Sequence, residues 1–141
     1  MAGREVFVDT SALYAFVNSR DEHHTRAAQV VTKAVKAGRS LVVSDYVITE
    51  AVNLAQVRGG KFVSSRVLDL LDQSVAIRVE WISPERFELA RAFFRKHADH
   101  GYSFTDCTSF ILMRELHIQE VLTTDRHFTE AGFRSLLSTV Q

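Results

Sequence analysis

The sequence predicts a single α/β domain over residues 1–141, with a parallel sheet of four to five strands covered by helices on both faces. Short apolar segments alternate with longer segments of helical periodicity, and this alternation favours right-handed crossovers and parallel strands. Hydrophobic residues make up 46% of the chain and proline occurs once. That composition supplies one hydrophobic core and excludes a disordered or fibrous class.

The N-terminal segment predicts a strand followed by two helices. Residues 4–9 form a short apolar strand, and residues 11–18 form a brief helix that a hydroxyl at position 10 or 11 can cap. Apolar residues then recur at helical spacing over residues 23–37, and Gly38 provides the stop.

The middle of the chain predicts a second strand and two successive helices. Residues 40–44 are built on a Leu-Val-Val core, which is typical of a buried strand. A helix follows over residues 45–58, with Asp45 as its N-cap. The pair of glycines at 59 and 60 breaks this helix, and another helix covers residues 62–73.

The second half predicts three more strands. A third strand covers residues 77–82, and Ser83 and Pro84 then open a helix that reaches residue 98, because proline suits the first helical position. Thr105 is expected to cap the next helix, over residues 106–116. The chain then forms a strand, a short helix and a further strand, at residues 120–123, 127–131 and 133–137.

Charge and composition limit the classes of partner. The chain has 17 basic and 17 acidic residues, which argues against a strongly basic nucleic-acid surface, although a local patch remains compatible with a polyanion. The longest apolar run, residues 12–17, is too short to cross a membrane, and the N-terminus lacks a secretory apolar region. Cys107 is the only cysteine, so an internal disulfide is excluded and a cytoplasmic location is favoured.

Four acidic residues accompany apolar segments. Asp9 and Asp125 follow predicted strands, Asp106 begins a predicted helix, and Glu50 lies within the helix after the second strand. A carboxylate beside buried hydrocarbon is costly to ionise unless a cation or hydrogen bonds compensate it. Sites in parallel sheets form at the carboxyl ends of the strands, which permits the four acids to converge there. We therefore expect them to hold a hard cation, Mg²⁺ or Mn²⁺.

Each acid also has an ordinary structural explanation. The three aspartates stand where they can cap helices, and Glu50 can be a solvated helix residue. Capping does not predict four acids at one edge, so we favour the metal site. Asp45 lies about 140° from Glu50 on a helical wheel and is assigned to capping alone.

Other side chains are assigned supporting or structural roles. Hydroxyls beside the acids can orient them, and the candidates are Thr10, Ser11, Thr105 and Thr124. Candidates for contact with a phosphate backbone are Arg86, Arg91, Arg95, Lys96 and Arg126. The six histidines show no zinc-binding spacing. Cys107 is expected to be a small buried residue, and Phe87, Phe93, Phe94 and Phe110 to be core residues rather than a base-stacking surface.

Taken together, these segments resemble the PIN-domain ribonucleases of the VapC toxin type. The matching pieces are VFVDTSAL at 6–13, Glu50, SFTDC at 103–107 and LTTDRHF at 122–128. The resemblance covers essentially the whole chain. It implies a PIN-like three-layer α/β/α fold and a magnesium or manganese site made by Asp9, Glu50, Asp106 and Asp125. It also implies RNA as the substrate, a small antitoxin protein as the partner, and a homodimer.

The expected activity is metal-assisted phosphodiester hydrolysis by an endoribonuclease, the toxin of a toxin–antitoxin pair. In this scheme the acids hold one or two divalent ions that lower the pKa of water and offset phosphate charge. The alternatives are a catalytically silent RNA-binding module on the same fold and a structure-specific DNA nuclease. A phosphatase with an aspartyl nucleophile is disfavoured, because it wants a second aspartate two residues after Asp9, where Ser11 stands.

Overall fold

The computed structural model describes residues 4–137, and its helices and strands alternate as the sequence predicts. The strands are Glu5–Val8 (β1), Ser40–Ser44 (β2), Ile77–Glu80 (β3), Glu120–Leu122 (β4) and Arg134–Ser135 (β5). The helices are Thr10–Val17 (α1), His24–Lys36 (α2), Asp45–Gln73 (α3), Pro84–Lys96 (α4), Phe104–Glu115 (α5) and Arg126–Glu130 (α6), with a 3₁₀ turn at Ala98–His100 (η1).

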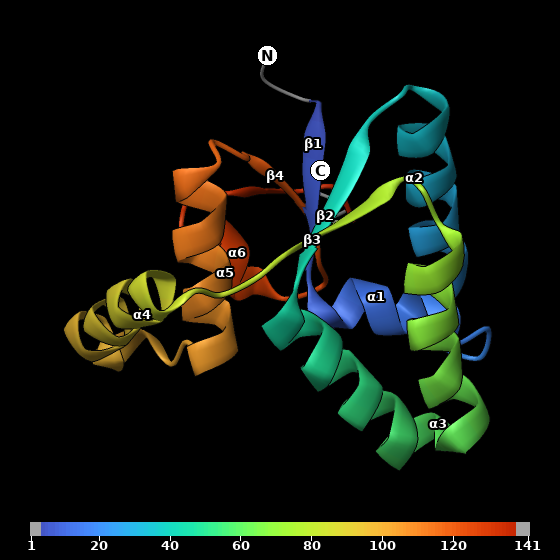
Figure 1. Cartoon of the computed structure of the whole chain (residues 1–141), viewed down its shortest axis with the longest axis horizontal. Coiled ribbons are helices and arrows are strands. Elements are labelled where there is room, and N and C mark those ends of the chain that lie inside the picture. The colour runs from blue at the N-terminus through green and yellow to red at the C-terminus, as the bar shows by residue number, and fades with distance from the viewer. Residues whose placement is uncertain (1–3, 138–141) are drawn as a thin grey trace.

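All five strands belong to one parallel sheet in the order β3-β2-β1-β4-β5. Figure 1 shows the sheet between two helical layers, with α1, α2 and α3 on one side and α4, α5 and α6 on the other. This arrangement confirms the predicted three-layer α/β/α architecture. Because β1 lies at the centre of the sheet, the residue that follows it lies between neighbouring strand ends.

The core forms around the three central strands, whose side chains are buried on both faces. Phe7, Val42 and Val121 are fully buried, as expected for parallel strands covered by helices on both sides. On the α5 side, Phe110 packs edge-to-face against Phe128, with ring centroids 4.9 Å apart. This contact anchors α5 and α6 to each other, and both helices begin at the candidate site.

The predicted helix break at the two glycines is confirmed. Helix α3 consists of two helical halves that meet at a kink at Gly60, whose φ of 83° and ψ of 176° are not helical. Only glycine adopts this conformation readily, because it has no Cβ. The bend separates a first half that carries Glu50 from a second half that packs on the α1 and α2 side (Figure 1).

Three predicted helix caps are wrong. Asp9, and neither Thr10 nor Ser11, occupies the N-cap position of α1. Ser44 caps α3, while the Asp45 carboxylate accepts a hydrogen bond from the backbone N–H of Ile82 at 2.8 Å. Helix α5 begins two residues earlier than predicted. Its cap is Ser103, and Thr105 lies inside the first turn.

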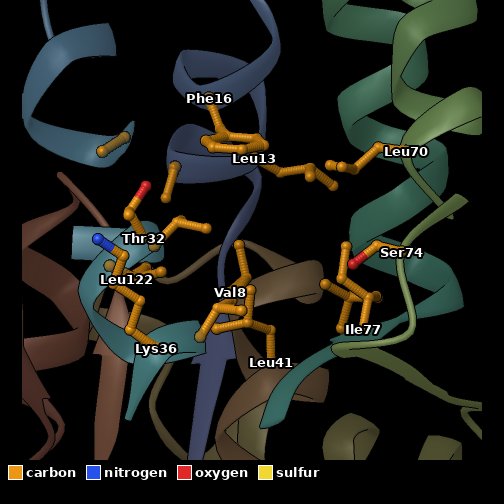
Figure 2. A pocket seen from close by; sticks show the side chains of 15 residues that line it. Val8, Leu13, Phe16, Thr32, Lys36, Leu41, Leu70, Ser74, Ile77 and Leu122 are labelled. Carbon is orange, nitrogen blue, oxygen red and sulfur yellow. The ribbon is translucent and has the colours of Figure 1, made fainter. Parts of the chain in front are cut away.

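An apolar cavity of about 410 Å³ lies between α2, the second half of α3 and the sheet. Figure 2 shows its lining, in which Val8, Leu41 and Leu122 come from the strands and Leu13 and Phe16 from α1. None of the four candidate acids lines it. The cavity therefore lies apart from the polar edge of the sheet, where the site must be sought.

Candidate metal centre

The carboxyl ends of β1 and β4 bring Asp9 and Asp125 to the same edge of the sheet. The two strands are neighbours, with Val8 paired to Leu122, and the N–H of Asp9 donates to the carbonyl of Leu122 at 3.0 Å. Asp9 comes directly after β1, and Asp125 follows β4 by three residues. Asp106 approaches from the first turn of α5.

Asp9 is the most buried acid of the group, with 4% of its surface exposed. Its Oδ2 accepts hydrogen bonds from Thr123 Oγ1 at 2.8 Å and from Ser11 Oγ at 3.2 Å. Its carboxylate does not cap α1, which removes the ordinary explanation for this residue. Burial raises the pKa of Asp9 to about 7, the Thr123 hydrogen bond opposes that rise, and the charges of Asp106 and Asp125 add to it.

Asp106 caps the N-terminus of α5 together with Ser103 and also faces the other acids. Ser103 Oγ accepts from the N–H of Asp106 at 3.0 Å, and Asp106 Oδ2 accepts from the N–H of Ser103 at 3.1 Å, which completes a capping box. Burial raises the pKa of Asp106, its backbone hydrogen bond with Ser103 lowers it, and the charge of Asp125 raises it further. Capping and membership of the acidic group therefore coexist in this residue.

Asp125 and His127 complete the group. Asp125 caps α6 by accepting the N–H of His127 at 2.9 Å. The imidazole Nδ1 of His127 lies 3.2 Å from Asp125 Oδ1 and 3.5 Å from Asp106 Oδ2. One ligand atom from each of these three residues lies within 4.8 Å of the others. The Asp125 cap that the sequence left open is thus present, beside a cluster with the dimensions of a cation site.

Glu50 lies at the margin of this group. It is exposed on the first half of α3, and its Oε1 accepts a hydrogen bond from Thr10 Oγ1 at 2.8 Å. Thr10 is the neighbour of Asp9 in the chain, so this bond joins Glu50 to the end of β1. Glu50 also lines a surface hollow together with Tyr46 and Thr105.

The hydroxyl residues divide into those that contact acids and those that do not. Thr10 and Ser11 donate to Glu50 and Asp9 as expected. The buried hydroxyl of Thr123 contacts Asp9 and also accepts the N–H of Asp125 at 2.9 Å. The sequence analysis chose the neighbouring Thr124 instead, which is exposed and donates its backbone N–H to Ser11 Oγ at 3.0 Å.

Thr123 and His127 are the two residues that the sequence analysis missed. For Thr123 the signal was its position directly after β4, at the edge of the sheet where Asp9 follows the neighbouring strand β1. For His127 the signal was its position two residues after an acid that opens a short helix. Thr105, which was expected to support an acid, lines the hollow beside Glu50.

The candidate RNA-binding arginines differ in their exposure and in their ion pairs with acidic residues. Arg86 is only 14% exposed and pairs with Glu80 at 3.1 Å and Glu115 at 2.6 Å. It therefore holds α4 to its surroundings, in contrast to the predicted substrate contact. Arg91 lies 3.6 Å from Glu88, and Arg126, which is 85% exposed, lies 3.4 Å from Glu130. These exposed pairs are weak and leave both guanidinium groups accessible.

Two further expectations about side chains have different outcomes. Cys107 is fully buried, and burial raises its pKa to about 11, so it stays a thiol as expected of a structural residue. The prediction that Phe87 and Phe94 are core residues is wrong. They are 36% and 40% exposed and gather around Phe104 on the surface.

The donor set suits a divalent cation. Asp9, Asp106 and Asp125 offer carboxylate oxygens, and the buried Nδ1 of His127 has no hydrogen-bond partner within residues 4–137. The charges of Asp106 and Asp125 raise the pKa of Asp9, and the charge of Asp125 raises the pKa of Asp106, so positive charge nearby favours the ionised form of both groups. The residues present therefore fit a hard or borderline divalent ion.

Residues 6–134 match the family model of the PIN domain. The chain belongs to the PIN domain family. This assignment agrees with the resemblance noted in the sequence, and the match spans β1 to β5, including all four candidate acids.

Among the relatives of this PIN domain is the 23S rRNA-specific endonuclease VapC20 of Mycobacterium tuberculosis. It is 34% identical over 132 residues, which cover 91% of this chain and 95% of VapC20. Ribonuclease VapC26 of the same organism is 27% identical over 125 residues, which cover 88% of this chain and 90% of VapC26.

Solved structures of VapC proteins have the same fold as this chain. The crystal structure of M. tuberculosis VapC20, described as a sarcin-ricin loop cleaving toxin, superimposes with a TM-score of 0.80 at 30% identity and covers 91% of this chain and 95% of that one. VapBC2 from Rickettsia felis shares the fold, with a TM-score of 0.66 at 10% identity over 93% of this chain and 96% of that one.

Within residues 4–137, no helix combines the length and the apolarity needed to cross a membrane.

Proposed function

We propose that this PIN domain is a divalent-metal-dependent endoribonuclease of the VapC type. The observation that carries the proposal is the meeting of Asp9, Asp106 and Asp125 at the carboxyl edge of the sheet. It occurs in a chain that is 34% identical to a 23S rRNA-specific endonuclease along almost its whole length. Fold alone would not support the activity, because one fold serves many functions.

The proposed ligands are Asp9, Asp106 and Asp125, with Glu50 at the margin, and the proposed ion is Mg²⁺ or Mn²⁺. When bound, such an ion supplies a Lewis acid that offsets phosphate charge and lowers the pKa of water. The chain supplies the positioning. Thr123 and Ser11 fix the Asp9 carboxylate, and the capping box with Ser103 fixes Asp106.

Glu50 has a different environment from the three aspartates. It is exposed and has one hydrogen bond, from Thr10. A carboxylate in that position faces solvent and can orient water at the edge of the site. We assign it to the side of the site that faces the substrate.

Large-subunit ribosomal RNA is the proposed substrate class, from the 34% identity to VapC20. Four cations can meet its backbone outside the acidic centre: Arg91, Arg95, Lys96 and Arg126. The first three lie in the last two turns of α4, and Arg126 begins α6 beside Asp125. The proposed protein partner is a small antitoxin that inhibits the nuclease, and the homodimer expected from the family remains a prediction.

The test is cleavage of a labelled sarcin-ricin loop oligonucleotide by the purified chain. We expect cleavage with Mg²⁺ or Mn²⁺, none after chelation, and recovery when the metal is restored. Asp106→Asn keeps an oxygen for the Ser103 N–H but removes the charge, so activity should fall by orders of magnitude while folding survives. Asp69→Asn is the matched control, because Asp69 is exposed on the second half of α3.

Three results would contradict the proposal. Undiminished cleavage by Asp106→Asn at saturating metal would remove the acidic centre from the chemistry. Equal cleavage of a DNA oligonucleotide of the same sequence would favour the DNA nuclease. An inert chain that still binds the RNA would favour the silent binding module.

A further inference from the structure

We propose that His127 is a nitrogen ligand of the divalent ion in this site and that it makes the site prefer Mn²⁺ to Mg²⁺. This inference rests on the proposed function, because it assigns one more residue to the same metal centre. It adds a selectivity that the four acids alone do not provide.

The imidazole of His127 is directed at the acids but does not bond to them. Nδ1 is buried and lacks a hydrogen-bond partner within the described residues, although it lies 3.2 Å from Asp125 Oδ1 and 3.5 Å from Asp106 Oδ2. A hydrogen bond between an imidazolium and a carboxylate is shorter, about 2.7–2.9 Å. Atoms that share one ion at about 2.1 Å lie about 3–4 Å apart, which matches both distances.

The ring is held in this place by contacts independent of any ion. The backbone N–H of His127 donates to Asp125 Oδ1, which fixes the first turn of α6. The ring of Tyr102 meets the imidazole edge-to-face, with centroids 5.4 Å apart and planes at 85°. Tyr102 in turn packs against Phe110 of the core at 5.0 Å. These contacts preorganise Nδ1 toward the acids.

A nitrogen donor changes which metal the site prefers. Carboxylates and water suit both Mg²⁺ and Mn²⁺, whereas imidazole suits transition metals, so a nitrogen ligand added to the acids favours Mn²⁺ over Mg²⁺. A purely electrostatic role for His127, as a cation between Asp106 and Asp125, would lower the affinity for every divalent ion. The two roles thus predict opposite effects when the imidazole is removed.

The decisive experiment is pulsed electron paramagnetic resonance of the chain loaded with Mn²⁺. We expect modulation from a directly bound ¹⁴N nucleus in the natural chain. The modulation should change to the ¹⁵N pattern when histidine is supplied as the ¹⁵N isotope, which needs no substitution. It should vanish in His127→Gln and persist in His23→Gln, since His23 is exposed and lies just before α2.

Competition titrations give a second measurement that does not involve RNA. In His127→Gln the affinity for Mn²⁺ should fall at least about tenfold while the affinity for Mg²⁺ changes much less. A nitrogen signal absent from the natural chain, or retained in His127→Gln, would overturn the assignment. So would tighter binding of both metals in the variant, which is the signature of the electrostatic role.

Failure of the metal centre itself would look different. If the natural chain bound no Mn²⁺, or if Asp106→Asn bound it equally well, the proposed function would fail together with this inference. If Mn²⁺ bound and depended on Asp106 but showed no nitrogen modulation, only the assignment of His127 would fail.

Discussion

Replacing Asp9 by Asn should stabilise the metal-free protein at neutral and higher pH. The carboxylate is buried, and its pKa rises from 3.8 to about 7 on folding, chiefly because burial penalises the charge. A rise of that size corresponds to about 4 kcal/mol of free energy of unfolding lost when the group is fully ionised. Asn removes the charge and keeps an oxygen that can accept the Thr123 hydroxyl.

The sign follows from proton binding. Between pH 3.8 and about 7 the folded chain holds the Asp9 proton that the unfolded chain releases, so stability falls as pH rises through this window. From this group alone, the natural chain should lose about 2–3 kcal/mol between pH 5 and pH 8. The Asp9→Asn variant should lack that loss.

The assay is urea unfolding in the presence of a chelator at several pH values, with Asp69→Asn as the exposed control. Metal at a hundredfold excess over its dissociation constant should then raise the free energy of unfolding of the natural chain by about 2.7 kcal/mol. The same metal should stabilise the variant much less. A variant that is less stable than the natural chain at pH 8, or a gain that does not depend on pH, would refute the reasoning.

Three further predictions concern structure around the site. Thr123→Val should lower the free energy of unfolding by about 1–3 kcal/mol, because buried Asp9 loses its hydrogen-bond donor, whereas Thr124→Val should be nearly neutral by the same urea titration. Gly60→Ala should cost about 1–3 kcal/mol from its backbone conformation alone, since a Cβ there meets no atom within 4 Å. Arg86→Gln should lower the melting temperature through loss of two ion pairs and change RNA affinity little. Arg95→Gln should lower RNA affinity in a filter-binding assay and change the melting temperature little.

The sequence by itself determined the order of the elements. Strands were evident because the parallel sheet is buried on both faces, so that each strand is a short apolar run between polar ends. Local chemistry also located the start of α4 at Ser83 and Pro84 and the bend of α3 at the two glycines. The positions of Asp9 and Asp125 after strands already implied that they share one edge of the sheet.

The tertiary structure decided which polar groups meet at that edge. Whether Thr123 or Thr124 contacts Asp9, and whether His127 reaches the acids, depends on the direction in which each side chain points in the folded chain. Local spacing in the sequence does not encode that direction. Arg86 shows the same limit, because its partner Glu115 is 29 residues away in the chain. Hydrophobic patterning specifies a helix or strand from residues within a few positions of one another. A site is made of side chains far apart in the sequence, which come into contact only when the strands have paired and the helices have packed on the sheet.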